Sequence, residues 1–128
     1  MRTSLSIAPP FSMLLVLDLQ FGEIPDSFDG RPFAHTSSCV AVGTKSADDG
    51  ATLITFTDES VAANDLALLF CGSVSVPSKA ISLANAYNEQ LAYAHIDSDI
   101  ARIEIWANAP REPSELLIRV SPSSGNGN

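Results

Sequence analysis

Short runs in which apolar and polar residues alternate recur along the chain, and turn residues separate them. In the run Ile100–Ala107, Ile103 and Ile105 share one face of an extended backbone, and Arg102 and Glu104 share the other. An alternation with a period of two is typical of half-buried β-strands. The pattern predicts strands over Ser12–Phe21, Ser37–Thr44, Ala51–Thr57, Leu66–Val76, Ile100–Ala107 and Glu115–Ser121.

Turn signals indicate how these strands connect. Asp48–Gly50 is a strong turn signal between Ser37–Thr44 and Ala51–Thr57, so we expect these two strands to form a hairpin. The segment Glu23–Phe33 is rich in Pro, Asp and Gly, which predicts a loop.

The segment Ser78–Ile96 has two interpretations. Ala80, Ala84, Tyr87 and Leu91 form a stripe at helical spacing, which favours a helix. The same segment also divides into two strand-like runs around a turn at residues 85–89. Because almost every other run in the chain is a strand, we predict two strands here and keep the helix as the alternative.

The predicted fold class is all-β, an antiparallel β-sandwich of seven or eight strands, with a barrel as the alternative. A chain of 128 residues is the usual size of one domain. We expect residues 1–10 to be a flexible N-terminal segment, residues 11–121 to form a single sandwich domain, and residues 122–128 to be a disordered tail of Ser, Pro, Gly and Asn.

Charge and composition exclude several function classes. The chain has 15 acidic and 7 basic residues and a formal charge of −8, which disfavours binding to nucleic acid or to anionic membranes. The apolar run Met13–Leu17 is far shorter than the ~20 residues of a membrane helix. With no cleavage signal of a secreted protein, a cytoplasmic location is expected.

The two cysteines, Cys39 and Cys71, lie in apolar strand-like runs, which predicts two buried free thiols. The alternative is a disulfide between neighbouring strands, which the sequence does not decide. No cofactor is predicted, because the chain has neither a phosphate-binding glycine loop nor a cysteine and histidine spacing typical of zinc sites.

Acidic residues fall in pairs at the predicted loops: Asp26 with Asp29, Asp48 with Asp49, Asp58 with Glu59, and Asp97 with Asp99. Turn formation alone accounts for this placement, because Asp side chains bind nearby backbone N–H groups. An alternative is a Ca²⁺ site built from loop carboxylates near Asp26, Asp29, Asp97 and Asp99.

Candidate catalytic residues are few. A small enzyme would have to use His35 or His95, the only histidines, but a nucleophile-elbow motif is absent. Trp106 and Tyr87 are interpreted mainly as half-buried packing residues. The chain is therefore predicted not to be an enzyme.

Four segments carry a resemblance to a known family: Leu17–Phe21, the turn Asp49–Ala51 leading to Phe56, Ser75–Pro77 and Ile100–Trp106. In their order along the chain they resemble the competence protein J family, small bacterial proteins described as inhibitors of a DNA-entry nuclease. The resemblance implies a β-sandwich and an inhibitor that binds a protein. An acidic inhibitor would suit a nuclease, whose active face is basic.

Our functional hypothesis is a non-enzymatic acidic domain that binds another protein, expected to be basic. Candidate partner-binding residues combine an aromatic anchor with nearby carboxylates. They are Trp106, Glu104, Asp97, Asp99, Asp48 and Asp49. An exposed edge strand would in addition allow a homodimer, since its backbone groups are unpaired.

Overall fold

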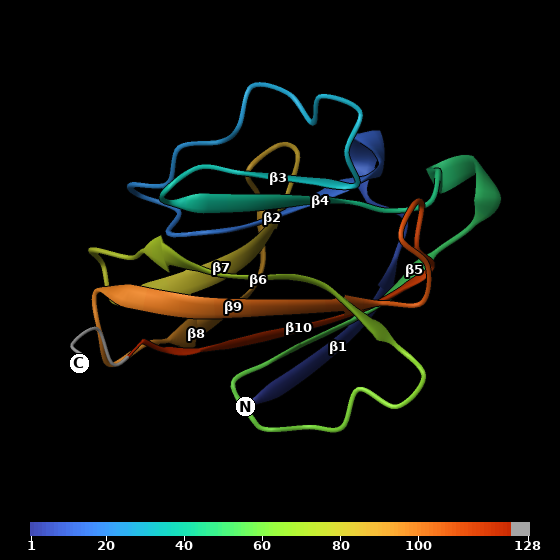
Figure 1. Cartoon of the computed structure of the whole chain (residues 1–128). Coiled ribbons are helices and arrows are strands. Elements are labelled where there is room, and N and C mark those ends of the chain that lie inside the picture. Colours follow the sequence, from blue (N-terminus) through green and yellow to red (C-terminus); the bar gives the residue numbers. More distant parts are fainter. Residues whose placement is uncertain (124–128) are drawn as a thin grey trace.

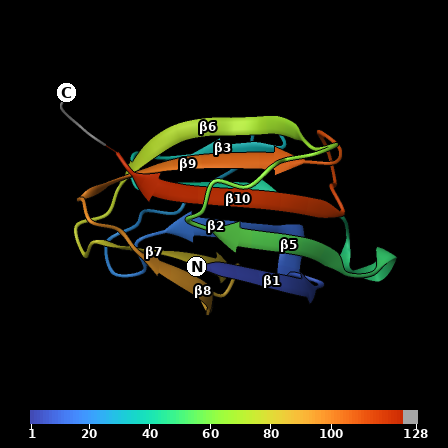
Figure 2. The ribbon, with the colours of Figure 1, turned by 90° about the horizontal axis from the view of Figure 1, so that it is seen from below.

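Ten β-strands in two five-stranded sheets make up the part of the chain that the computed structural model describes, residues 1–123 (Figure 1). Sheet A has the spatial order β1 (Arg2–Ile7), β5 (Thr52–Thr57), β10 (Glu115–Pro122), β9 (Ile100–Ala107), β6 (Ala67–Ser75). Sheet B has the order β3 (Phe33–His35), β4 (Cys39–Gly43), β2 (Met13–Leu17), β7 (Ala80–Asn85), β8 (Gln90–His95). The sheets pack face to face and do not close into a barrel, so the predicted β-sandwich is confirmed (Figure 2).

The hairpin expected around Asp48–Gly50 is wrong. The strand β4 pairs with β2 and β3 in sheet B, whereas β5 pairs with β1 and β10 in sheet A. The connection between β4 and β5 contains the short 3₁₀ turn η2 (Ala47–Asp49) and passes from one sheet to the other. A turn signal marks a change of chain direction, but the next strand is placed by the apolar surface that it buries.

One pair of strands departs from the predicted antiparallel arrangement. The strand β10 runs parallel to β5, with Leu116 opposite Ile54 and Ile118 opposite Phe56. All four of these side chains are buried. The parallel pair brings the last strand of sheet A into the centre of its sheet, between β5 and β9.

The segment Ser78–Ile96 forms two strands, as predicted, and the helical alternative is wrong. The strands β7 and β8 pair through a turn in which the Asn85 side chain accepts hydrogen bonds from the backbone N–H groups of Tyr87 (3.0 Å) and Glu89 (3.1 Å). Asn88 has a positive φ of 62°, a conformation that Asn tolerates well. The hydrogen bonds of this turn therefore outweigh the helical spacing of the apolar residues in the segment.

The core lies between the two sheets, and a second apolar cluster lies outside sheet B. The alternate residues Leu14 and Val16 of β2 belong to the main core. Leu15 and Leu17 belong to the second cluster, which Leu19 and Phe28 of the following loop help to cover. The strand β2 ends at Leu17, short of the predicted Phe21, because both of its faces are buried and the chain turns away to cover one of them.

The N-terminal segment, residues 1–10, for which the sequence predicted flexibility, contains a strand. Residues 2–7 form the edge strand β1, which pairs with β5, and Leu5 and Ile7 pack against the core. At the other end, Pro122 of β10 still pairs with Ala101 of β9. The rest of the predicted tail beyond Ser123 lies outside the described residues. The two strands that the sequence pattern missed are β1 and the three-residue β3.

Candidate protein-binding surfaces

The acidic pairs Asp48–Asp49 and Asp97–Asp99 lie at opposite ends of the sandwich. Asp48 and Asp49 belong to η2, which lies near the start of β10 because the Lys45 N–H group donates to the Pro113 carbonyl (3.0 Å). Asp97 and Asp99 precede the start of β9, which runs antiparallel to β10. Eight residues of β9 span roughly 23 Å, so the two pairs lie too far apart to contact the same side chain of a partner.

These four carboxylates are exposed, and none of them forms an ion pair within residues 1–123. The backbone groups of Asp48 and Asp99 nevertheless form hydrogen bonds that hold the turns. The Ser46 hydroxyl accepts a hydrogen bond from the Asp48 N–H group (3.2 Å), and the Asp99 carbonyl accepts one from Val76 (2.8 Å). Both acidic pairs therefore belong to hydrogen-bonded turns, and their carboxylates still present unpaired negative charge.

Glu104 differs from them, because its charge is compensated. The side chain lies on the outer face of β9 and pairs with Arg119 at 2.9 Å and Arg102 at 3.3 Å. Arg119 is the residue directly opposite Glu104 on β10. Glu104 therefore forms the centre of a small cross-strand network and contributes little net negative charge to this face.

Trp106 is half-buried on the same outer face, which agrees with its interpretation as a packing residue. The strand register places it between Leu68 of β6 and Leu117 of β10. Residues 58–66 connect β5 to β6 across this face, as Figure 2 shows. Leu117 is only 5% exposed although it belongs to the outer face, because this connection lies over it.

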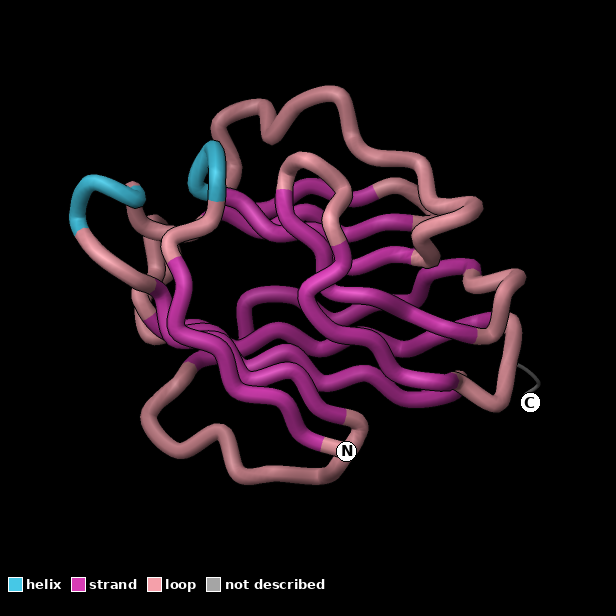
Figure 3. The backbone as a smooth tube through the Cα atoms, turned by 180° about the vertical axis from the view of Figure 1, so that it is seen from behind, coloured by secondary structure: helices cyan, strands magenta, loops and turns pink. Residues whose placement is uncertain are grey.

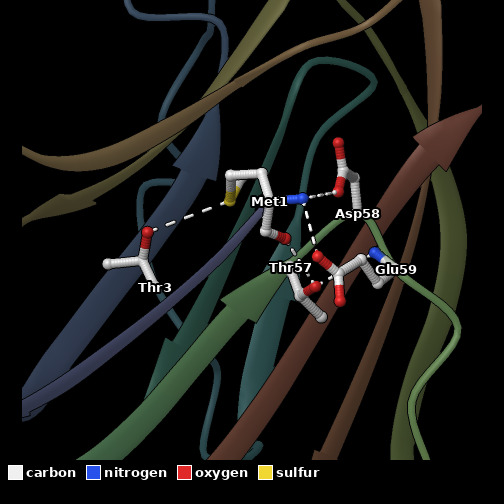
Figure 4. A network of polar contacts seen from close by, with 5 residues as sticks. All are labelled: Met1, Thr3, Thr57, Asp58 and Glu59. Carbon is white, nitrogen blue, oxygen red and sulfur yellow. Dashed lines mark hydrogen bonds and ion pairs between the residues drawn. The ribbon is translucent and has the colours of Figure 1, made fainter.

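A network of polar contacts anchors the start of that connection (Figure 4). The Met1 ammonium group lies 2.9 Å from the Asp58 carboxylate and 2.8 Å from that of Glu59, and the Thr57 hydroxyl donates to the Met1 carbonyl. The hydrogen bond to Asp58, followed by that to Glu59, raises the pKa of the amine above 8.0. Asp58 and Glu59 are therefore engaged in holding the N-terminus.

The two histidines lie far apart. His35 ends β3 and His95 ends β8, and these strands form opposite edges of sheet B. Both side chains are exposed, and the ring of His35 packs against Phe70 with centroids 5.4 Å apart. Neither histidine therefore has the other as a partner for acid–base chemistry.

The prediction of two buried thiols holds for Cys39 and is wrong for Cys71. Both are free, but Cys71 is exposed on the outer face of β6, opposite Glu104. The apolar run of β6 misled the prediction, because this edge strand packs only one face against the core. Burial raises the pKa of the Cys39 thiol to about 12, outweighing the hydrogen bond with the Val16 backbone.

Residues 1–123 contain neither a cluster of metal-binding side chains nor a helix that could span a membrane. No group of three or more His, Cys, Asp or Glu side chains is arranged to hold a metal ion. Asp26 and Asp29, considered above as calcium ligands, line a hollow of about 390 Å³ together with the cationic residue Arg31. In the same part of the chain, no helix is long and apolar enough to cross a membrane.

Sequence reasoning missed a buried polar brace around Asp18. This side chain is 1% exposed, and its carboxylate accepts hydrogen bonds from the Ser78 N–H (2.8 Å), the Ser78 hydroxyl (3.0 Å) and the Gln20 N–H (3.0 Å). It links the end of β2 to the turn that carries the chain from β6 in sheet A to β7 in sheet B. Asp18 directly after the apolar run Met13–Leu17 was the available signal.

A second missed feature is an exposed aromatic pair. Phe11 is 75% exposed and Tyr87 is 64% exposed, and their rings meet edge to face with centroids 5.7 Å apart. This position corrects the interpretation of Tyr87 as a packing residue. Phe11 belongs to the short 3₁₀ turn η1 (Pro10–Ser12), and the preceding prolines were the signal for an unusual turn.

Comparison with known proteins shows a shared fold. No family model matches the chain, and no curated protein matches its sequence. Among solved structures, the chain is similar to the crystal structure of ComJ, inhibitor of the DNA degrading activity of NucA, from Bacillus subtilis. The TM-score is 0.55 at 12% sequence identity, and the match covers 96% of each chain. The resemblance to the competence protein J family is thus confirmed at the level of the fold.

Proposed function

We propose that this protein is a non-enzymatic inhibitor that binds a nuclease or a similar basic protein in the cytoplasm. The observation that carries the proposal is the fold similarity to a nuclease inhibitor over 96% of both chains. A shared fold by itself does not define a function, so the charge of the chain provides the second support.

A basic partner suits the distribution of charge over the surface. A formal charge of −8 speeds the encounter with a positively charged protein and disfavours nucleic acid as a direct ligand. Asp48, Asp49, Asp97 and Asp99 carry free negative charge at loop positions, where binding residues are common. Glu104 and Trp106 contribute to a contact on the outer face of sheet A only if the partner also meets Arg102 and Arg119.

The cytoplasmic location is supported by the two free thiols. Cys71 is exposed and Cys39 is buried, and neither is paired. Reducing compartments keep thiols in this state.

The test measures inhibition of a nuclease directly. Purified NucA is incubated with DNA at low ionic strength, and the rate of DNA degradation is followed while the protein is added. We expect the rate to fall as the protein approaches a molar excess, and the inhibition to weaken with added salt, because charge attraction is screened. An unchanged rate at a large molar excess and low salt would contradict the proposal.

Two charge-reversed variants locate the surface that acts. One is Asp97→Lys with Asp99→Lys, and the other is Asp48→Lys with Asp49→Lys. They change the net charge equally but at opposite ends of the sandwich. Contact at one end predicts that only one variant loses inhibition, whereas an equal and small effect of both would indicate attraction by net charge alone.

A further inference from the structure

Three turns meet at the end of the sandwich that carries Phe11. The Thr44 N–H group donates to the Ser12 carbonyl (2.8 Å), and η1 lies against η2. Leu14 pairs with Asn85, which places the turn between β7 and β8 beside η1. Figure 3 shows the two helical turns next to each other at this end. We call the exposed rings of Phe11 and Tyr87, with the hollow beside Phe11, the aromatic end.

The aromatic end contains both a projection and a hollow. Phe11 and Tyr87 project into solvent as an exposed pair. The adjoining hollow has a volume of about 300 Å³, and Phe28, Pro32 and Gly43 line it beside Phe11 itself. Exposed aromatic side chains next to a partly apolar hollow are typical of interfaces, where such anchors supply most of the affinity.

The backbone holds Phe11 outward at an energetic cost. Phe11 has φ 57° and ψ 18°, and Ser12 follows with φ 55°, so two consecutive non-glycine residues adopt the left-handed conformation. A bulky residue pays for this conformation, and such strain is concentrated at functional positions. A glycine at position 11 would remove both the strain and the ring, so stability of the fold does not explain a phenylalanine here.

Both signs of charge surround the aromatic end. Arg31, Arg111 and Glu112 line the hollow, and Asp48 and Asp49 lie on the neighbouring turn η2. None of these side chains is ion-paired within residues 1–123. A purely basic partner would meet Arg31 and Arg111 unfavourably, whereas a surface that carries the same mixture would be complementary.

We propose that the aromatic end binds a second copy of this chain in a two-fold symmetric dimer. A two-fold interface brings the same patch of both subunits together, so the patch must complement itself. The aromatic end meets this condition, because Phe11 of one copy can enter the hollow of the other. The η2 carboxylates then face the guanidinium groups of Arg31 and Arg111. This arrangement differs from pairing of edge strands and leaves Asp97 and Asp99 at the far end free.

The experiment is sedimentation equilibrium of the purified full chain over a range of concentrations. The wild type is expected to approach twice the monomer mass of 13.5 kDa. Phe11→Gly, Phe11→Ala and Tyr87→Ala should each raise the dissociation constant at least about tenfold, as expected for central aromatic anchors. At a concentration low enough for both proteins to be monomeric, Phe11→Gly should in addition keep or raise the melting temperature, which separates loss of contact from loss of fold. The control is Tyr93→Ala, because Tyr93 is similarly exposed, at 60%, on the edge strand β8.

A charge swap tests the register of the two copies. Asp48→Lys with Asp49→Lys, and Arg31→Glu with Arg111→Glu, should each give a monomer, and an equal mixture of the two variants should recover a heterodimer. A wild type that stays monomeric at every concentration would overturn the proposal. So would a dimer that persists in Phe11→Ala or that only Tyr93→Ala dissociates. If Phe11→Ala leaves a monomeric wild type unchanged in mass but abolishes inhibition of NucA, the aromatic end belongs to the nuclease and the dimer is refuted.

Discussion

Replacing Asp18 with alanine should destabilise the fold by about 3 kcal/mol. The carboxylate is 1% exposed and accepts three hydrogen bonds, two from Ser78 and one from the Gln20 N–H group. A hydrogen bond to a charged group contributes about 1.5–3 kcal/mol, and a buried donor without a partner costs about 1–3 kcal/mol. Alanine also removes the cost of burying the Asp18 charge, which offsets part of this sum. We therefore expect the loss in free energy of unfolding to be close to the contribution of one strong hydrogen bond.

Ser78 is the main hydrogen-bond partner of Asp18 in this brace. Ser78 lies in the turn between β6 and β7, closed by the bond from the Lys79 N–H group to the Val76 carbonyl (2.8 Å). Asp18→Asn keeps the shape of the side chain but cannot accept at every position, so it should cost about half as much as alanine. In a double-mutant cycle, Asp18→Ala and Ser78→Ala should be less than additive by about 1 kcal/mol, because they remove a shared bond.

The assay is urea unfolding followed by the fluorescence of Trp106, the only tryptophan. A loss of about 3 kcal/mol corresponds to about 10 °C in melting temperature for a chain of this size. Asp97→Ala is the matched control: an exposed loop aspartate whose removal should change stability by less than about 0.5 kcal/mol. An Asp18→Ala variant as stable as Asp97→Ala would refute the brace.

Three further predictions concern close packing and the thiols. Gly22→Ala should destabilise the fold by about 1–3 kcal/mol in the same unfolding assay, because a Cβ at this position would lie 2.8 Å from both the Asp18 carbonyl oxygen and the Leu17 side chain. A Gly22→Ala variant as stable as the wild type would contradict this close packing. In the native protein, Cys71 should react with a water-soluble alkylating reagent, whereas Cys39 should react only after unfolding, as mass spectrometry of the labelled peptides would show. Equal reaction rates of the two thiols would contradict the burial of Cys39. Burial raises the pKa of the Cys39 thiol from 9.0 to about 12. The contribution of this neutral thiol to the free energy of unfolding is therefore fully present below pH 9. It is lost as the pH rises toward 12, because the thiol ionises at lower pH in the unfolded chain than in the folded one. The free energy of unfolding should fall in this range by about 1.4 kcal/mol per pH unit more steeply than in Cys39→Ala; parallel pH profiles of the two proteins would refute this.

Alternation of apolar and polar residues by itself determined where most strands form. Ile100–Ala107 has the same bounds in the prediction and in β9, because alternate side chains of a strand must face opposite sides. The two strands within Ser78–Ile96 also followed from the sequence once the predominance of strands elsewhere was considered. The acidic loop pairs were likewise placed correctly at turns, since turn chemistry is local.

Only the tertiary structure decided which strands pair and which side chains are covered. β4 and β5 follow each other in the chain but belong to different sheets, because each strand pairs where its apolar faces are buried. Burial follows the same rule: the first half of β6, Ala67–Cys71, is entirely apolar, yet Cys71 is exposed because β6 is an edge strand.

The candidate surfaces show the same division. Asp48 and Asp97 were both identified from the sequence, but only the packed fold places them at opposite ends of the sandwich. The contact between Phe11 and Tyr87 joins residues far apart in the chain, through the pairing of β2 with β7. Composition and periodicity act locally and therefore determine elements and net charge. The grouping of side chains into a surface depends on long-range packing, which the order of residues alone does not reveal.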